Sequence, residues 1–216
     1  MPQLDRTAWW TRRAIQLAWF TIAYNLIEGV VAIGFGLSDD SIALFGFGLD
    51  SLIEVASAGL VLWRFREERG AHASGATERE RFAARGIGIL LVTLAVIVTA
   101  GAVSNLVRHV PPETAIPGMI VSLVSLSFMF LLWRSKTRAA RALDSATVRS
   151  DAACSLACIQ LSLVLLAGSA LYRFLPTLWW ADSAAAVALA ILIGREGWTG
   201  IAASRRPDFS GGCGCH

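Results

Sequence analysis

The sequence predicts an all-α, polytopic membrane protein with six transmembrane helices and both termini in the cytoplasm. Of its 216 residues, 55% are hydrophobic and only 16% are charged, and the mean hydropathy is +0.58. This composition is too apolar for an ordinary soluble domain. Six apolar segments have near-spanning length, at about 14–37, 41–63, 86–107, 115–133, 146–172 and 178–200.

Basic side chains predict the orientation of these spans. Of the 19 Lys and Arg residues, 17 lie before the first span, between spans two and three, between spans four and five, or after the sixth. Only Arg108 and Arg173 fall on the opposite side. Because cytoplasmic loops are enriched in Lys and Arg, both termini are expected in the cytoplasm. The net charge of +3 reflects this topology and does not indicate nucleic-acid binding.

The chain divides into three parts by composition. Residues 1–13 are expected to be a cytoplasmic or interfacial lead-in, and residues 14–203 the six-span transmembrane domain. Residues 204–216 are expected to form a flexible cytoplasmic tail that ends in Cys213, Cys215 and His216. A cytoplasmic tail would keep these thiols reduced. The tail is therefore either a loose site for a soft metal ion or a disordered terminus.

Two carboxylates interrupt the second apolar segment, from Ser41 to Arg66. Asp50 and Glu54 are four residues apart and share one helix face. A charge at the centre of a spanning helix costs about 2.5–3.5 kcal/mol, so such acids usually face a cavity, an ion or a partner. The interiors of the predicted spans contain no Lys, Arg or His. We therefore expect a divalent cation or protons, rather than a basic side chain, to neutralise this pair.

The fifth segment has a second polar face. At 100° per residue one face contains Thr147, Asp151, Cys154, Cys158 and Ser162. If this helix begins near Arg141, Asp151 lies about 15 Å from its cytoplasmic end, at a height similar to that of Glu54. The acids of spans two and five are therefore expected to meet. Buried cysteines usually behave as small hydrophobes, so Cys154 and Cys158 are either packing residues or thiol ligands.

The first span contains a pair of polar residues one helical turn apart, and the second span contains several small residues. In the first span, Asn25 and Glu28 share a face, and either form interhelical hydrogen bonds or place Glu28 on an ion or proton path. The second span also contains small residues, which are expected to let neighbouring backbones approach. These small residues are Gly46, Gly48, Ser51, Ser57 and Gly59.

Several motifs resemble a known family of transporters. They are S-I-A-L-x₅-D-S-L-I-E from Ser41 to Glu54, R-S-D-A around Asp151 and W-A-D-S around Asp182. Together they resemble the membrane domain of the cation diffusion facilitators, the cation-efflux family. The runs D-A-x₅-C, which ends at Cys158, and R-E-G-W look like the short bacterial members that lack the C-terminal cytoplasmic domain.

The resemblance implies a site and a mechanism. Spans one, two, four and five would form a tight core, and a homodimer in the bacterial inner membrane would export divalent cations in exchange for protons. The implied metal-binding tetrad is Asp50 and Glu54 from span two with Asp151 and Thr147 from span five. Thr147 stands where zinc-transporting relatives commonly have His or Asp. Water or a thiol of Cys154 or Cys158 could replace it as the fourth ligand.

The predicted function is thus metal/proton antiport by alternating access, with Zn²⁺ favoured as cargo and Cd²⁺, Co²⁺, Mn²⁺ or Fe²⁺ as alternatives. Because metal and protons would compete for the same carboxylates, their exchange would follow. The alternative is a non-transporting membrane metal sensor or interaction protein that uses the Cys-rich tail. Paired carboxylates can also perform acid–base catalysis, but no protease or transferase motif accompanies them, so no enzyme is expected.

Overall fold

The protein is a bundle of six α-helices in a computed structural model that describes residues 3–38, 42–66, 76–110 and 116–211. The described residues contain no strand. The helices are α1 (Gln3–Ser38), α2 (Ile42–Arg66), α3 (Ala76–Arg108), α4 (Ile116–Leu143), α5 (Ala146–Phe174) and α6 (Ala181–Arg205), with a short 3₁₀ helix at Pro176–Leu178. The fold is all-α, as predicted.

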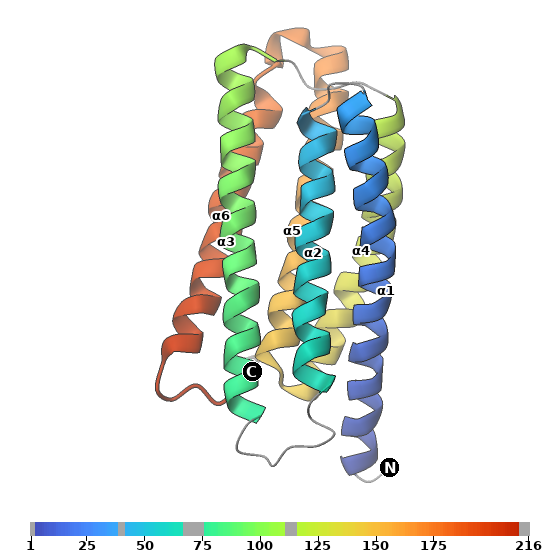
Figure 1. Ribbon diagram of the computed structural model, residues 1–216. Coiled ribbons are helices and arrows are strands. Elements are labelled where there is room, and N and C mark those ends of the chain that lie inside the picture. The colour runs from blue at the N-terminus through green and yellow to red at the C-terminus, as the bar shows by residue number, and fades with distance from the viewer. Residues whose placement is uncertain (1–2, 39–41, 67–75, 111–115, 212–216) are drawn as a thin grey trace.

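Four of the helices enclose the polar interior. Helix α1 packs against α2 and α4, and α5 packs against α2 and α4, which closes a ring of α1, α2, α5 and α4. Helices α3 and α6 pair closely with each other and lie against α2 and α5 at one side (Figure 1). This arrangement agrees with the core that the family resemblance implied.

The described chain begins and ends at the same end of the bundle (Figure 1). We call this the terminal end, which is the end where Gln3 and Gly211 lie. Since successive helices alternate in direction, α2 and α4 finish there and α5 starts there. Arg108 and Arg173 close α3 and α5 at the opposite end, whereas Arg64 closes α2 at the terminal end. This separation is the one that the charge pattern predicted.

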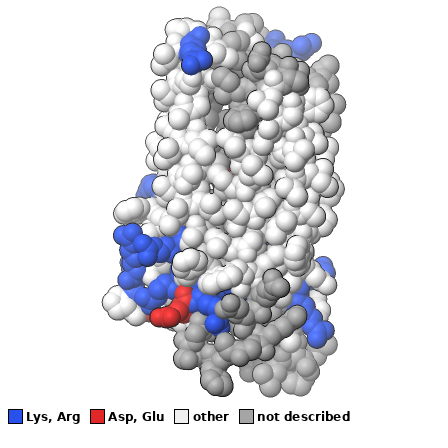
Figure 2. All heavy atoms as spheres, viewed as in Figure 1, with Lys and Arg blue, Asp and Glu red and all other residues white. Residues whose placement is uncertain are grey.

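Four helical segments within the described residues are long and apolar enough to cross a membrane: Arg6–Phe35, Thr77–Arg108, Ala146–Phe174 and Ser183–Arg205. The visible face of the molecule has a broad uncharged band between its two ends (Figure 2). Large apolar side chains such as Ile27, Val96 and Leu131 are exposed on the surface. A lipid environment would cover them. The count of six spans and the position of the termini stay predictions.

Several helices extend beyond the apolar segments from which they were predicted. Helix α1 includes the lead-in from Gln3, α3 begins at Ala76 rather than near 86, and α4 continues ten residues past Trp133 to Leu143. Arg, Glu and Ala are good helix formers, so the charged extensions keep the backbone hydrogen bonding of the apolar segments. Hydropathy therefore located the apolar part of each helix but not its ends.

Two helix pairs meet closely at glycines. A Cβ atom on Gly48 of α2 would lie 2.5 Å from Ile33 Cγ1 and 3.1 Å from the carbonyl oxygen of Gly29, both on α1. A Cβ on Gly88 of α3 would lie 2.8 Å from the carbonyl oxygen of Gly197 on α6. The packing role predicted for Gly48 is confirmed, since only a residue without Cβ allows this approach. Gly46 lies outside the described side chains.

The same interpretation was wrong for Gly59. No described atom lies within 4 Å of the Cβ position there, so no neighbouring backbone requires a small residue. Ser51 and Ser57 are fully buried, but they act as hydrogen-bond donors to acids on other helices. Small residues on α2 therefore serve two purposes that the sequence pattern did not separate.

Candidate functional site

The bundle interior contains a lysine held between two acids. Lys136 of α4 is 1% exposed, and its Nζ lies 3.1 Å from Glu54 Oε1 of α2 and 3.0 Å from Asp151 Oδ2 of α5. Its third donor bond goes to Ser155 Oγ, at 2.9 Å. An ammonium group has three N–H donors, so all three are used. Three helices are joined through one nitrogen atom.

Two serines complete this group. Ser57 Oγ donates to Asp151 Oδ1 at 2.7 Å, and Ser155 Oγ donates to Glu54 Oε1. We call Glu54, Ser57, Lys136, Asp151 and Ser155 the lysine cluster. All five are buried, with relative exposures of 0–1%. With both carboxylates ionised, the two acids carry a charge of −2. The single lysine therefore leaves the cluster with a net charge of −1.

The predicted meeting of the acids of α2 and α5 is confirmed through this shared ammonium. The predicted distance of Asp151 from the start of its helix was wrong, because α5 begins at Ala146 rather than near Arg141, and Asp151 lies about 7.5 Å along it. The expectation that no basic side chain neutralises the acids was also wrong. Hydropathy ended the fourth span at Trp133, but α4 continues and turns Lys136 into the bundle.

A signal in the sequence could have identified this residue. Lys136 is the only lysine in the chain, and every other basic residue apart from three histidines is an arginine. A lone lysine among 18 arginines suggests a position where a compact, flexible ammonium is needed rather than a planar guanidinium.

Asp50 lies one helical turn before Glu54 on α2, farther from the terminal end. It is 4% exposed, and its carboxyl group interacts electrostatically with the thiol of Cys158 on α5. Among the described residues, Asp50 Oδ2 and Glu54 Oε2 have no hydrogen-bond partner. Buried carboxylate oxygens normally have partners. These two oxygens are therefore free acceptors in the bundle interior.

Glu28 of α1 forms a third acidic position. It accepts hydrogen bonds from Tyr24 Oη at 3.0 Å, on the same helix, and from Ser51 Oγ of α2 at 3.1 Å. The interhelical hydrogen bond expected for Glu28 is thus present. Asn25 does not form one with its amide nitrogen, which donates to the Thr21 carbonyl oxygen of its own helix.

Thr147 is held by a different acid. Its backbone N–H donates to Glu80 Oε1 of α3 at 2.8 Å, and its hydroxyl donates to the Glu80 carbonyl oxygen at 3.3 Å. Glu80 also accepts from Ser145 Oγ at 2.5 Å and pairs with Arg64. Thr147 shares the buried face of Asp151, but its hydrogen bonds join the start of α5 to Glu80 rather than to the lysine cluster. In the sequence, Glu80 falls between the apolar segments 41–63 and 86–107, outside every predicted span.

Glu80→Gln is expected to lower the free energy of unfolding by about 3 kcal/mol, because Arg64 would lose its buried anionic partner. Thermal unfolding in detergent micelles measures this effect. Glu78→Gln, two residues earlier on the exposed side of α3, is the matched control and should change stability by less than about 0.5 kcal/mol. Equal stability of the two variants would contradict a structural role for Glu80.

The acids form a column along the bundle. Along α5, the polar face from Thr147 to Cys158 extends about 16 Å inward from the terminal end. Glu80 lies nearest that end, Asp151 and Glu54 lie deeper in the bundle, and Asp50 lies deepest of the four. Among the described residues, no group of three or more His, Cys, Asp or Glu side chains is close enough to hold a metal ion. In this conformation the carboxylates meet through Lys136 instead. The tail residues Cys213, Cys215 and His216 lie outside the described residues.

Comparison with known proteins gives a family and a relative for this chain. The cation efflux transmembrane domain family matches residues 18–206, which is most of the chain. The chain belongs to the cation efflux family. It is also 25% identical over 184 residues to Transmembrane protein 163 of Xenopus laevis. That alignment covers 84% of this chain and 64% of the relative, so the chain spans just under two thirds of the relative's length.

The match to the cation efflux family includes every residue of the lysine cluster, together with Asp50, Glu28 and Thr147. Membership supports a multi-pass membrane protein that moves cations. Because Lys136 occupies the space between Glu54 and Asp151, any ion held by both acids in this cation efflux protein has to share their oxygens with the ammonium or replace it.

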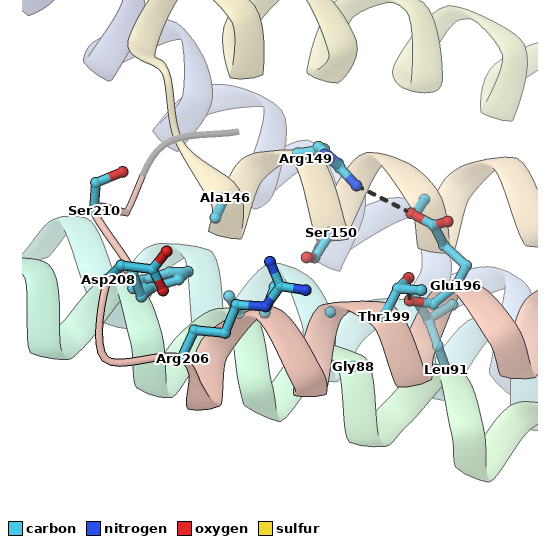
Figure 3. A pocket seen from close by; sticks show the side chains of 15 residues that line it. Gly88, Leu91, Ala146, Arg149, Ser150, Glu196, Thr199, Arg206, Asp208 and Ser210 are labelled. Atoms are coloured by element: carbon cyan, nitrogen blue, oxygen red, sulfur yellow. Dashed lines mark hydrogen bonds and ion pairs between the residues drawn. The ribbon is translucent and has the colours of Figure 1, made fainter. Parts of the chain in front are cut away.

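A separate hollow of about 260 Å³ lies among α3, α5, α6 and the segment after α6. Figure 3 shows Arg149 and Glu196 across it, with Arg206 and Asp208 at its other side. Arg149 Nη2 lies 3.6 Å from Glu196 Oε1, and both side chains are about half exposed. Exposed ion pairs contribute little to stability. None of the acids of the lysine cluster lines this hollow, so it is distinct from the predicted ion site of the cation efflux fold.

Proposed function

We propose that this cation efflux protein is a divalent-cation transporter that exchanges metal for protons by alternating access. Asp50, Glu54 and Asp151 are the proposed cargo ligands. Thr147 stays the proposed fourth ligand, with Cys154, Cys158 and Glu28 as further candidates. Since its backbone and hydroxyl bind Glu80, Thr147 would need to change partner to reach the ion.

The observation that supports this proposal best is the convergence of Glu54 and Asp151 on a single cation. Two carboxylates from different helices, both at most 1% exposed, approach one positive charge at 3.1 and 3.0 Å. Ligating oxygens typically surround hard divalent cations at slightly shorter range, 2.0–2.6 Å. Free oxygens on Glu54 and Asp50 add acceptors on the same side of α2.

Proton coupling follows from the chemistry of these groups. When a 2+ ion leaves, carboxylates buried together repel each other and bind protons more readily. A returning ion displaces those protons. The same oxygens therefore serve metal and protons alternately, and a proton gradient can drive export. We propose no enzymatic reaction.

The donor atoms bear on which ion is carried. The lysine cluster offers only oxygen, which suits Mn²⁺, Fe²⁺ or Co²⁺, whereas the Cys158 thiol beside Asp50 would favour Zn²⁺ or Cd²⁺. We propose Zn²⁺ or a similar transition metal as the cargo, bound near Asp50. We also propose a homodimer in a bacterial inner membrane, with the terminal end in the cytoplasm, because the arginines concentrate at that end.

A flux panel in proteoliposomes tests the proposal. Zn²⁺, Cd²⁺, Co²⁺, Mn²⁺ and Fe²⁺ are supplied with and without a pH gradient, and both ion and proton movement are recorded. Asp50→Asn should reduce flux by about tenfold or more, because removing one charged ligand costs at least about 1.4 kcal/mol. Glu78→Gln is the control for an acid outside the bundle interior. Unchanged flux in Asp50→Asn, or no flux of any of the five ions in wild type, would refute the assignment.

A further inference from the structure

Lys136 is a cation that the protein itself places between two proposed cargo ligands. Its ammonium bonds Glu54 Oε1, Asp151 Oδ2 and Ser155 Oγ at 3.1, 3.0 and 2.9 Å. The side chain is 1% exposed and all three donors are used. An ion coordinated by Glu54 and Asp151 together would have to occupy the space in which Nζ lies.

The charge of the cluster makes the two cations mutually exclusive. With both acids ionised, the ammonium leaves a net charge of −1, and a divalent ion in its place would leave a net charge of zero. Both together would place two cations against the same two oxygens, Glu54 Oε1 and Asp151 Oδ2, in a site shielded from water, where like charges repel strongly. The same carboxylates can thus bind the ammonium or a divalent ion well, but not both.

Lys136 lies a short way from the terminal end of the bundle. It lies seven residues before the end of α4, which is about 10 Å from the terminal end of the bundle. A lysine has a flexible four-carbon stem that can carry its ammonium along a helix toward water. Ser57 and Ser155 would stay behind, and their hydroxyl oxygens would then be free to face the ion.

We propose that Lys136 is a tethered competitor of the cargo, which fills the site between Glu54 and Asp151 when no divalent ion is bound and withdraws when one binds. This inference rests on the proposed transport function and adds a residue to it. The ammonium neutralises one of the two acidic charges in the empty protein and lowers the apparent affinity for the ion, which favours release.

The single lysine allows a direct test in the wild-type protein. An amine-reactive succinimidyl ester is applied to protein in detergent micelles with increasing Zn²⁺ or Mn²⁺, and the modification of Lys136 is measured by mass spectrometry. The rate is expected to be low without metal and to rise about tenfold at saturation, since a side chain must leave its buried bonds to react. The N-terminal amine is an internal reference whose rate should not change.

Arg138→Lys supplies a matched control, because residue 138 is exposed on the same helix. The lysine introduced there should react quickly with or without metal. If an ion that the wild type transports leaves the reactivity of Lys136 unchanged or lowers it, the competitor role is overturned while the transport function stands. If none of the ions is transported and none alters the reactivity, both proposals fail.

Two substitutions with opposite effects separate competition from a purely structural role. Metal binding is measured by calorimetry in a Cys213→Ser, Cys215→Ser background, so that the tail thiols do not bind Zn²⁺. Lys136→Gln should bind Zn²⁺ or Mn²⁺ about tenfold more tightly, because a competing occupant of the site is removed. Lys136→Arg should bind about tenfold more weakly, because a forked guanidinium holds carboxylates more firmly. Weaker binding by both variants would overturn the proposal.

Discussion

Asp151→Asn is expected to reduce divalent-cation flux by more than about 100-fold while leaving the fold intact. The substitution removes one of the two carboxylates at the lysine cluster, and losing a charged partner in a buried site costs about 3 kcal/mol, which is a factor of about 100 in binding. Lys136 would then balance Glu54 alone, so the cluster becomes neutral without an ion. A divalent cation in the cluster would then be coordinated by one carboxylate, Glu54, instead of two.

The stability of this variant distinguishes a ligand from a structural acid. Because Lys136 keeps Glu54, Ser155 and the amide oxygen of the new side chain as partners, unfolding should become easier by only about 1 kcal/mol. Flux is measured in proteoliposomes and stability by thermal unfolding in micelles. Asp208→Asn, an exposed acid at the terminal end, is the control. Flux within twofold of wild type in Asp151→Asn would remove this residue from the proposed cargo ligands.

Much of this site follows from helix geometry applied to the sequence. The face that contains Thr147, Asp151, Cys154, Cys158 and Ser162 is buried throughout, with relative exposures of 0–3%. An amphipathic pattern inside an apolar helix identifies such a face because polar side chains turn away from lipid. Helix periodicity alone was therefore enough to predict that the acids of α2 and α5 meet.

The lysine escaped the same reasoning because hydropathy marks where apolar residues stop, not where a helix stops. The predicted fourth span ends at Trp133 because charged residues follow, although Arg, Lys and Ala continue a helix readily. Whether Lys136 points to water or into the bundle depends on the crossing of α4 with α2 and α5, which is tertiary information. Neutralisation of Glu54 by a distant residue could not be derived from α2 alone.

Thr147 shows that helix periodicity predicts which face is buried but not which residue lies against it. Its place four residues before Asp151 puts both on one face, and both are indeed buried. The acid that binds its backbone is Glu80, 67 residues earlier in the chain and on another helix. A carboxylate at a helix start is favoured by the helix dipole and the unpaired N–H groups there. Periodicity identifies a face but not the neighbour that the fold brings against it.

Gly197→Ala is expected to lower the free energy of unfolding by about 2 kcal/mol, because overpacking at a tight contact costs about 1–3 kcal/mol. A Cβ at this position of α6 would lie 2.7 Å from the carbonyl oxygen of Gly88 and 2.9 Å from Leu91 Cβ on α3. A backbone oxygen cannot rotate away as a side chain can, so α3 and α6 would have to separate. Tryptophan fluorescence during thermal unfolding measures the loss.

Gly101→Ala on α3 is the matched control for this prediction. No described atom lies within 4 Å of its Cβ position, so the added methyl group meets no neighbour. Alanine is a better helix former than glycine by up to about 1 kcal/mol, so this variant should be more stable than wild type. The opposite signs of the two changes separate close packing from helix propensity. If both variants were stabilised, the α3–α6 contact would tolerate a methyl group, and its closeness would not depend on glycine.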